Sequence, residues 1–103
     1  MSHIDSYKAN AEALIKDLRN GTDFNDIHTT HGIISTNPRD AEEKGNPATI
    51  ILTYGGPTVF IAVHPSEAIL HYSFGEEKDS ALLTNNEKDI ELLKSFVSAV
   101  SNN

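Results

Sequence analysis

Three turn sequences at short, regular intervals in residues 48–84 constrain the fold of this chain more than any other feature. They are Gly55-Gly56-Pro57, His64-Pro65-Ser66-Glu67 and Gly75-Glu76-Glu77-Lys78. Between and beside them lie four segments rich in strand-forming residues, at 48–54, 58–63, 68–74 and 79–84. Parallel strands need long crossover connections, so these short links predict a four-stranded antiparallel meander.

Centring each turn predicts which residues lie opposite one another in neighbouring strands. The predicted pairs are Ile51 with Phe60, Phe60 with His71, and His71 with Leu82. One face of the sheet is then apolar and forms a core, whereas the other is rich in Thr and Ser and is crossed by this single row. We predict that the row binds a partner, because contiguous exposed apolar residues often mark interaction sites. The alternative is that the N-terminal helix or the segment 24–27 covers it.

Apolar residues at helical spacing predict a first helix over residues 2–20. Gly21 stands where a helix C-cap belongs, because glycine adopts the left-handed conformation that ends many helices. A short helical turn carrying Phe24 and Ile27 follows and ends at Gly32. This turn and the first helix are the candidate cover for one side of the sheet.

A second amphipathic helix is predicted over residues 86–100, with Thr84 and Glu87 as a capping box at its start. The segment 35–47 is rich in Asn, Pro, Asp, Glu and Gly, which is typical of a long exposed loop. The predicted fold is therefore a single α+β domain over residues 1–103. It consists of a four-stranded antiparallel β-meander with N-terminal and C-terminal amphipathic helices.

The charge of the chain narrows the choice of ligand. Its 103 residues include 15 acidic and 8 basic side chains, a formal net charge of −7. The basic residues are scattered among acids, so we expect no direct binding to nucleic acid, which needs clustered Lys and Arg. A protein with a basic surface is the better candidate partner, because complementary charge steers association. The alternative is that the charge only keeps the domain soluble.

Composition also indicates the compartment. The chain has no cysteine, which excludes a disulfide scaffold and a thiol nucleophile. Its longest apolar run, Val59–Val63, is far shorter than the roughly 20 residues that span a membrane. The first residues, MSHID, have neither the basic patch nor the apolar core of a secretory signal. We therefore expect a cytoplasmic protein that does not contact membranes.

Two acidic clusters lie in predicted loops, one before the four strands and one at the turn between the third and the fourth. Carboxylates at the ends of a small sheet can imitate spaced phosphates and so occupy a nucleic-acid-binding partner. The alternative is that both clusters only face water, as like-charge clusters commonly do. The residues concerned are Asp40, Glu42, Glu43, Glu76, Glu77 and Asp79.

His28 and His31 are three positions apart, close enough on a helical turn to share a metal ion. Asp23 and Asp26 lie nearby as candidate carboxylate ligands. A catalytic zinc helix more often contains His-Glu-x-x-His, in which the glutamate acts as a base, and this sequence lacks that glutamate. We therefore predict no metal site, no cofactor and no catalytic residue.

The segment ILTYGGPTVFI at 51–61, followed by LHYSFG at 70–75, resembles small accessory proteins carried by phages and mobile elements. In those proteins a strand, a Gly-Gly-Pro turn, an apolar strand, an aromatic strand and a terminal helix occur in this order. The resemblance spans residues 49–100. Small acidic α+β proteins of that setting include inhibitors of bacterial defence, among them anti-CRISPR proteins. The resemblance implies an inhibitor and assigns no functional residue.

The function predicted from these features is that of a non-enzymatic, acidic binding protein. Its partner would be a protein with a basic, nucleic-acid-binding surface, in line with an inhibitor of host defence carried by a mobile element. The row Ile51–Phe60–His71–Leu82 would anchor the partner and the acidic loops would steer it. One alternative is a self-associating structural or regulatory protein that forms a homodimer through the open sheet face. Another is a metal-dependent enzyme that uses His28 and His31.

Overall fold

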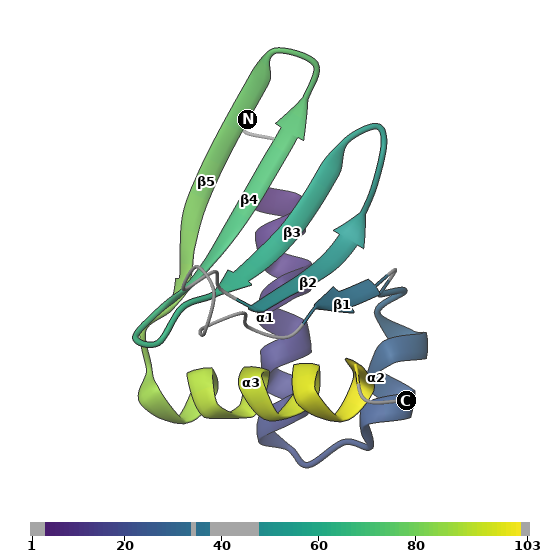
Figure 1. Ribbon diagram of the computed structural model, residues 1–103, viewed down its shortest axis with the longest axis vertical. Helices are drawn as coiled ribbons and strands as arrows, with labels where there is room; N and C mark the ends of the chain where they lie inside the picture. Colours follow the sequence, from purple (N-terminus) through teal and green to yellow (C-terminus); the bar gives the residue numbers. More distant parts are fainter. Residues whose placement is uncertain (1–3, 34, 38–47, 102–103) are drawn as a thin grey trace.

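The computed structural model describes residues 4–33, 35–37 and 48–101. Its elements, in chain order, are α1 (Ile4–Arg19), α2 (Phe24–Thr30), β1 (Ser35–Asn37), β2 (Ala48–Thr53), β3 (Thr58–Val63), β4 (Ala68–Phe74), β5 (Glu77–Thr84) and α3 (Glu87–Ser101). All strand pairs are antiparallel, and the spatial order β1-β2-β3-β4-β5 follows the chain (Figure 1). The predicted α+β class, with its four-stranded meander and its two terminal helices, is confirmed.

The sheet has one more strand than the sequence predicted. Residues 35–37, expected to lie in a loop, form β1 and pair with β2 in a register that places Thr36 opposite Ile50. The sequence of β1, Ser-Thr-Asn, contains no apolar residue and therefore none of the alternation that predicts a strand. Only its pairing with β2 distinguishes β1 from a loop. The predicted loop residues Asp40, Glu42 and Glu43 lie outside the described residues.

Both N-terminal helices end at a glycine, as predicted. Gly21, at φ +76°, donates its backbone N–H to the carbonyl of Leu18, and Thr22 donates to the carbonyl of Asp17. This is the Schellman arrangement, which satisfies carbonyls that the helix itself leaves free. α2 ends in the same way at Gly32, whose φ is +61°. No described helix is long and apolar enough to cross a lipid bilayer.

The start of α3 differs from the predicted capping box. Asn86 is the cap, because its side-chain oxygen accepts from the backbone N–H groups of Lys88 at 2.9 Å and Asp89 at 3.3 Å. Thr84 lies two residues too early for that role. Its hydroxyl instead accepts from the Asn86 N–H at 3.1 Å and donates to the Asp89 carboxylate at 2.9 Å.

The register of β2, β3 and β4 agrees with the prediction around the centre of the sheet. Ile51 lies opposite Phe60, and Phe60 lies opposite His71. Beyond Ile51 the β2–β3 register shifts, so that Thr53 lies opposite Val59 and Leu52 has no partner of its own. A symmetric turn at Gly55-Gly56 also predicts that Leu52 pairs with Val59 and Thr53 with Thr58, and both of these predictions were wrong.

The β4–β5 register differs from the prediction by two residues. The turn is Gly75-Glu76, not Glu76-Glu77, and Phe74 lies opposite Glu77. Gly75 has φ +62°, the conformation that a two-residue hairpin of type II′ requires at its first position. A shift of two residues leaves each side chain on its predicted face but gives it a different cross-strand neighbour.

The core lies between one face of the sheet and the helices. α1 runs behind the sheet in Figure 1, and α3 crosses near one end of the strands. α2 places Ile27 in the same core, and the Phe24 ring meets the Phe96 ring edge-on at 5.4 Å. The fully buried side chains that join these layers include Leu14, Ile27, Ile50, Ile61, Leu70, Leu93 and Phe96.

Candidate binding surface

Within residues 4–33, 35–37 and 48–101, the helices pack on one side of the sheet, and we call the other side the open face. Phe24 and Ile27, considered above as a cover for this face, pack on the opposite side instead. α1 likewise contributes its buried residues to the core on that side. The register assigns to this face the side chains of Thr49, Ile51, Thr58, Phe60, Ala62, Ile69, His71, Ser73, Lys78, Ser80 and Leu82. Ala62 is only 2% exposed, so the face is not open along its whole length.

A stacked pair of rings stands at the centre of the open face. The Phe60 and His71 rings lie 4.9 Å apart, centroid to centroid, and are tilted by only 23°. Burial lowers the pKa of His71 below its ordinary 6.5, and the nearby His64 lowers it further. The neutral imidazole is therefore favoured at this position, which keeps the centre of the face uncharged.

Two shallow hollows meet at Phe60. One, of about 380 Å³, extends from Phe60 and His71 toward Lys78 and Ser80 on β5. The other, of about 270 Å³, extends from Phe60 toward Ile51. Phe60 therefore lies between a hollow of mixed polar and apolar lining and an almost wholly apolar one, and it lines both.

Leu82 lies on the open face, but it is not in the row to which the sequence analysis assigned it. Because of the two-residue shift between β4 and β5, Ser80 lies opposite His71, and Leu82 lies opposite Ile69. The observed row is thus Ile51–Phe60–His71–Ser80. Leu82 remains 48% exposed and extends the apolar surface beside Ile69, a residue that the sequence analysis did not single out. The alternation of β4 would have placed Ile69 here.

The predicted acidic residues of the β4–β5 hairpin do not share the face of the ring pair. Asp79 lies opposite the buried Tyr72, and Glu77 lies opposite Phe74, so both belong to the side of the sheet that carries the helices. Glu76 lies in the turn itself. All three are exposed, at the end of the hairpin that projects upward in Figure 1. Lys78 and Asp79 nevertheless both line the hollow of about 380 Å³ that contains Phe60 and His71.

The two histidines considered for a metal site have separate environments. His31 Nε2 lies 2.8 Å from the Asp17 carboxylate of α1, whereas His28 makes no such contact within the described residues. Asp23 uses its carboxylate to cap α2 by accepting from the Asn25 N–H at 2.9 Å. In the described part of the chain no three side chains of the metal-binding types come together.

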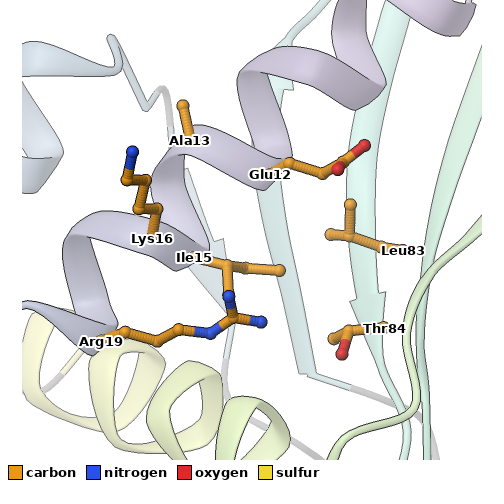
Figure 2. A pocket seen from close by; sticks show the side chains of 7 residues that line it. All are labelled: Glu12, Ala13, Ile15, Lys16, Arg19, Leu83 and Thr84. Atoms are coloured by element: carbon orange, nitrogen blue, oxygen red, sulfur yellow. The ribbon is translucent and has the colours of Figure 1, made fainter.

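An ion pair between Arg19 and Asp89, completed by Thr84, joins three elements of the fold. Arg19 donates from Nε and Nη2 to both oxygens of Asp89, at 2.7 and 2.5 Å, and Thr84 donates to the same carboxylate. Asp89 is only 2% exposed, and its hydrogen bonds from Arg19 lower its pKa despite the opposing effect of burial. Figure 2 shows Arg19 among the residues that line a hollow of about 390 Å³ between α1 and β5, together with Lys16 and Thr84. These hydrogen bonds link the end of α1 to the start of α3, and Asp89 in turn links α3 to the end of β5.

Sequence patterns gave no signal for the Arg19–Asp89 and His31–Asp17 contacts, because both depend on how the helices meet. The remaining source of information is similarity to known proteins. Comparison with protein-family models, with curated proteins and with solved structures finds no match to this chain. The open face is therefore the feature of the chain that bears most directly on its function.

Proposed function

We propose that this chain is a non-enzymatic binding protein that holds a partner protein against its open face. The observation that supports this most directly is the stacked pair of Phe60 and His71 at the centre of a sheet face on which none of the three helices packs. Aromatic side chains at the centre of a surface are the usual anchors of protein interfaces. The hydroxyl-bearing residues around them offer hydrogen bonds without the desolvation cost of charged groups.

The partner we propose is a protein with a basic surface beside an apolar patch. The net charge of −7 favours encounter with a positive surface, and it opposes approach of a nucleic acid backbone. Glu76, Glu77 and Asp79 lie at one end of the sheet, and the field of exposed charges extends about 8–10 Å at physiological salt. These carboxylates therefore raise the association rate of a basic partner, whereas the contacts of the ring pair lower its dissociation rate.

A nucleic-acid-binding protein of host defence fits this description, and we propose that class of partner with the cytoplasm as the site of action. The resemblance to phage and mobile-element proteins, including anti-CRISPR proteins, stays a prediction. Occupation of a phosphate-binding surface by carboxylates would explain the acidic balance of the chain. The proposal needs no catalytic group and no cofactor.

The test is affinity capture from lysate of the native host, with the bound proteins identified at low and moderate salt. Wild type is compared with Phe60→Asp and with Ala13→Asp, which adds the same charge at an exposed position of α1. We expect wild type and Ala13→Asp to retain a basic, nucleic-acid-binding protein that Phe60→Asp loses. Equal recovery by all three proteins would refute a role for the open face.

Self-association through the open face is the second candidate, and sedimentation velocity over a range of concentrations tests it. A dimer that Phe60→Asp dissociates would assign the open face to a second copy of the chain. The like charge of two copies opposes this arrangement, since each carries −7. Lys at positions 76, 77 and 79 should slow capture of a basic partner and would speed dimerisation, so the two candidates respond in opposite directions.

A further inference from the structure

A small pocket lies at the corner where α1, the end of α2 and the end of β2 meet, on the helix side of the sheet. Its volume is about 220 Å³, below the roughly 300–1,000 Å³ of sites for drug-sized ligands. Apolar walls come from Tyr7, Leu14 and Leu52. Leu52 reaches the pocket at the irregularity in the β2–β3 register, where it has no partner in β3. The pocket is thus of a size for a molecule with one small ring or a short chain.

The polar side of the pocket is built around His31, with Asn10 and Thr30 beside it. The imidazole is largely buried, with 14% of the side chain exposed, and its Nε2 lies 2.8 Å from the Asp17 carboxylate. Because an ionised carboxylate only accepts hydrogen bonds, this contact places a proton on Nε2. In the neutral ring, Nδ1 then carries the free lone pair.

Nδ1 is the ring atom left for a ligand. Asp17 is the one described residue that hydrogen-bonds the His31 ring, and no buried side-chain nitrogen or oxygen in the described part of the chain lacks a partner. Among the described residues, Nδ1 thus has no recorded hydrogen-bond partner, and His31 lines the pocket. The Gly32 C-cap and the His31 backbone N–H, which donates to the carbonyl of Ile27 at 3.0 Å, fix the position of the residue. A fixed acceptor beside apolar walls is a preorganised feature of small-ligand sites.

We propose that this pocket binds a small, uncharged molecule with an apolar body and a hydroxyl group, and that the hydroxyl donates to Nδ1 of His31. The apolar body lies against Leu14, Leu52 and the Tyr7 ring. A carboxylate of the same size is rejected, because it has no proton to donate and meets the negative charge of Asp17. The site is separate from the open face and stands independently of the proposed function.

The experiment is an NMR titration of the full-length chain with benzyl alcohol at a pH of about 8, where an ordinary histidine is neutral. Benzoate, which has the same ring and a carboxylate, is the matched probe. With benzyl alcohol we expect saturable shifts of the Asn10, Thr30 and Thr53 amides and an upfield shift of the His31 Nδ1 resonance. Benzoate should give neither.

Two variants separate the hydrogen bond from mere filling of the pocket. His31→Phe keeps a ring in place but removes the acceptor, and we expect benzyl alcohol to bind about fivefold more weakly, as for loss of one hydrogen bond. Asp17→Ala releases Nε2 and should also weaken binding, without adding bulk. His28→Phe, on the same short helix and outside the pocket, should bind as wild type does.

The outcomes that would overturn the proposal are specific. One is the absence of saturable shifts around the pocket up to the solubility limit of benzyl alcohol. The others are equal affinity for benzoate, or equal affinity in a folded His31→Phe protein. If His31→Phe does not fold, an unchanged affinity in Asp17→Ala has the same consequence. Capture of a partner at the open face has no bearing on any of these results.

Discussion

Arg19 and Asp89 are 70 positions apart in the chain, yet the guanidinium holds both carboxylate oxygens at 2.7 and 2.5 Å. The contact joins the last turn of α1 to the first turn of α3. Arg19 remains half-exposed, whereas Asp89 is almost fully buried. A buried carboxylate depends on its partners, so this pair fixes the angle between the two helices that cover the sheet.

Removal of either partner should therefore lower stability. We expect Arg19→Met, which keeps most of the side-chain length, to reduce Tm by roughly 5 °C or more, since it leaves Asp89 buried with Thr84 as its remaining side-chain partner. Asp89→Asn should reduce the loss of stability in acid. The lowered pKa of Asp89 means that its ionised form stabilises the fold above pH 3.8, and that this contribution disappears as the pH falls through the folded-state value. Thermal unfolding between pH 2 and pH 7 measures both effects.

The glycine caps give a second prediction. Gly21→Ala and Gly32→Ala should each lower the free energy of unfolding by about 1 kcal/mol, because alanine is disfavoured at positive φ. No atom lies close enough to either position for a new methyl group to clash, so the backbone conformation accounts for the whole loss. Gly56→Ala is the control, because its φ is not in the left-handed range. Urea unfolding measures the differences. An equal cost at all three positions would mean that backbone conformation is not the cause.

The stability of the domain should depend on His71 below neutral pH. The folded-state pKa of His71 is lowered, so below pH 6.5 the unfolded chain binds more protons there than the folded chain does. The free energy of unfolding should consequently fall as the pH drops below 6.5. Above pH 6.5, His71 should make no pH-dependent contribution to it. His71→Phe keeps a ring against Phe60 and should reduce the slope, as measured by urea unfolding from pH 5 to pH 8. If the pH dependence of stability is the same in His71→Phe as in wild type, other titratable groups cause it.

Two phenylalanines test the difference between the core and the open face. Phe96 is fully buried between α2 and the sheet, so Phe96→Ala should cost about 3–5 kcal/mol. Phe60→Ala removes a ring that is only partly buried, and we expect about 1 kcal/mol. Urea unfolding of the two variants gives both values. Similar large losses would show that the open face contributes to folding as a core does.

Much of the fold could be predicted because local signals agreed with one another. The turn sequences and the alternation of β3 and β4 fixed the faces of the sheet, and Gly21 and Gly32 marked the helix ends. The position of the β4–β5 turn was wrong by one residue, since centring it on Glu76-Glu77 overlooked Gly75, which adopts the positive φ that the first turn position requires. The error moved Leu82 to a different neighbour but left it on the open face.

The remaining features depend on contacts between distant segments. β1 is a strand only because β2 lies beside it, and Asn86 rather than Thr84 caps α3 because Thr84 is the last residue of β5. The hydrogen bond of His31 to Asp17 requires α2 to fold back against α1 at a particular angle. Periodicity and composition give no information about the angle between α1 and α2. The pocket beside His31 therefore could not be predicted from the sequence.

β5 is the last strand of the sheet, and its outer edge carries backbone donors and acceptors that no described strand uses. At one end, Glu77, Lys78 and Asp79 place three charges in a row, which disfavours the addition of a strand from another molecule. The other half, Ser80–Thr84, has no charge. If this domain forms fibrils when partly unfolded, growth should therefore begin at the second half of β5, and a lysine at position 82 should delay it.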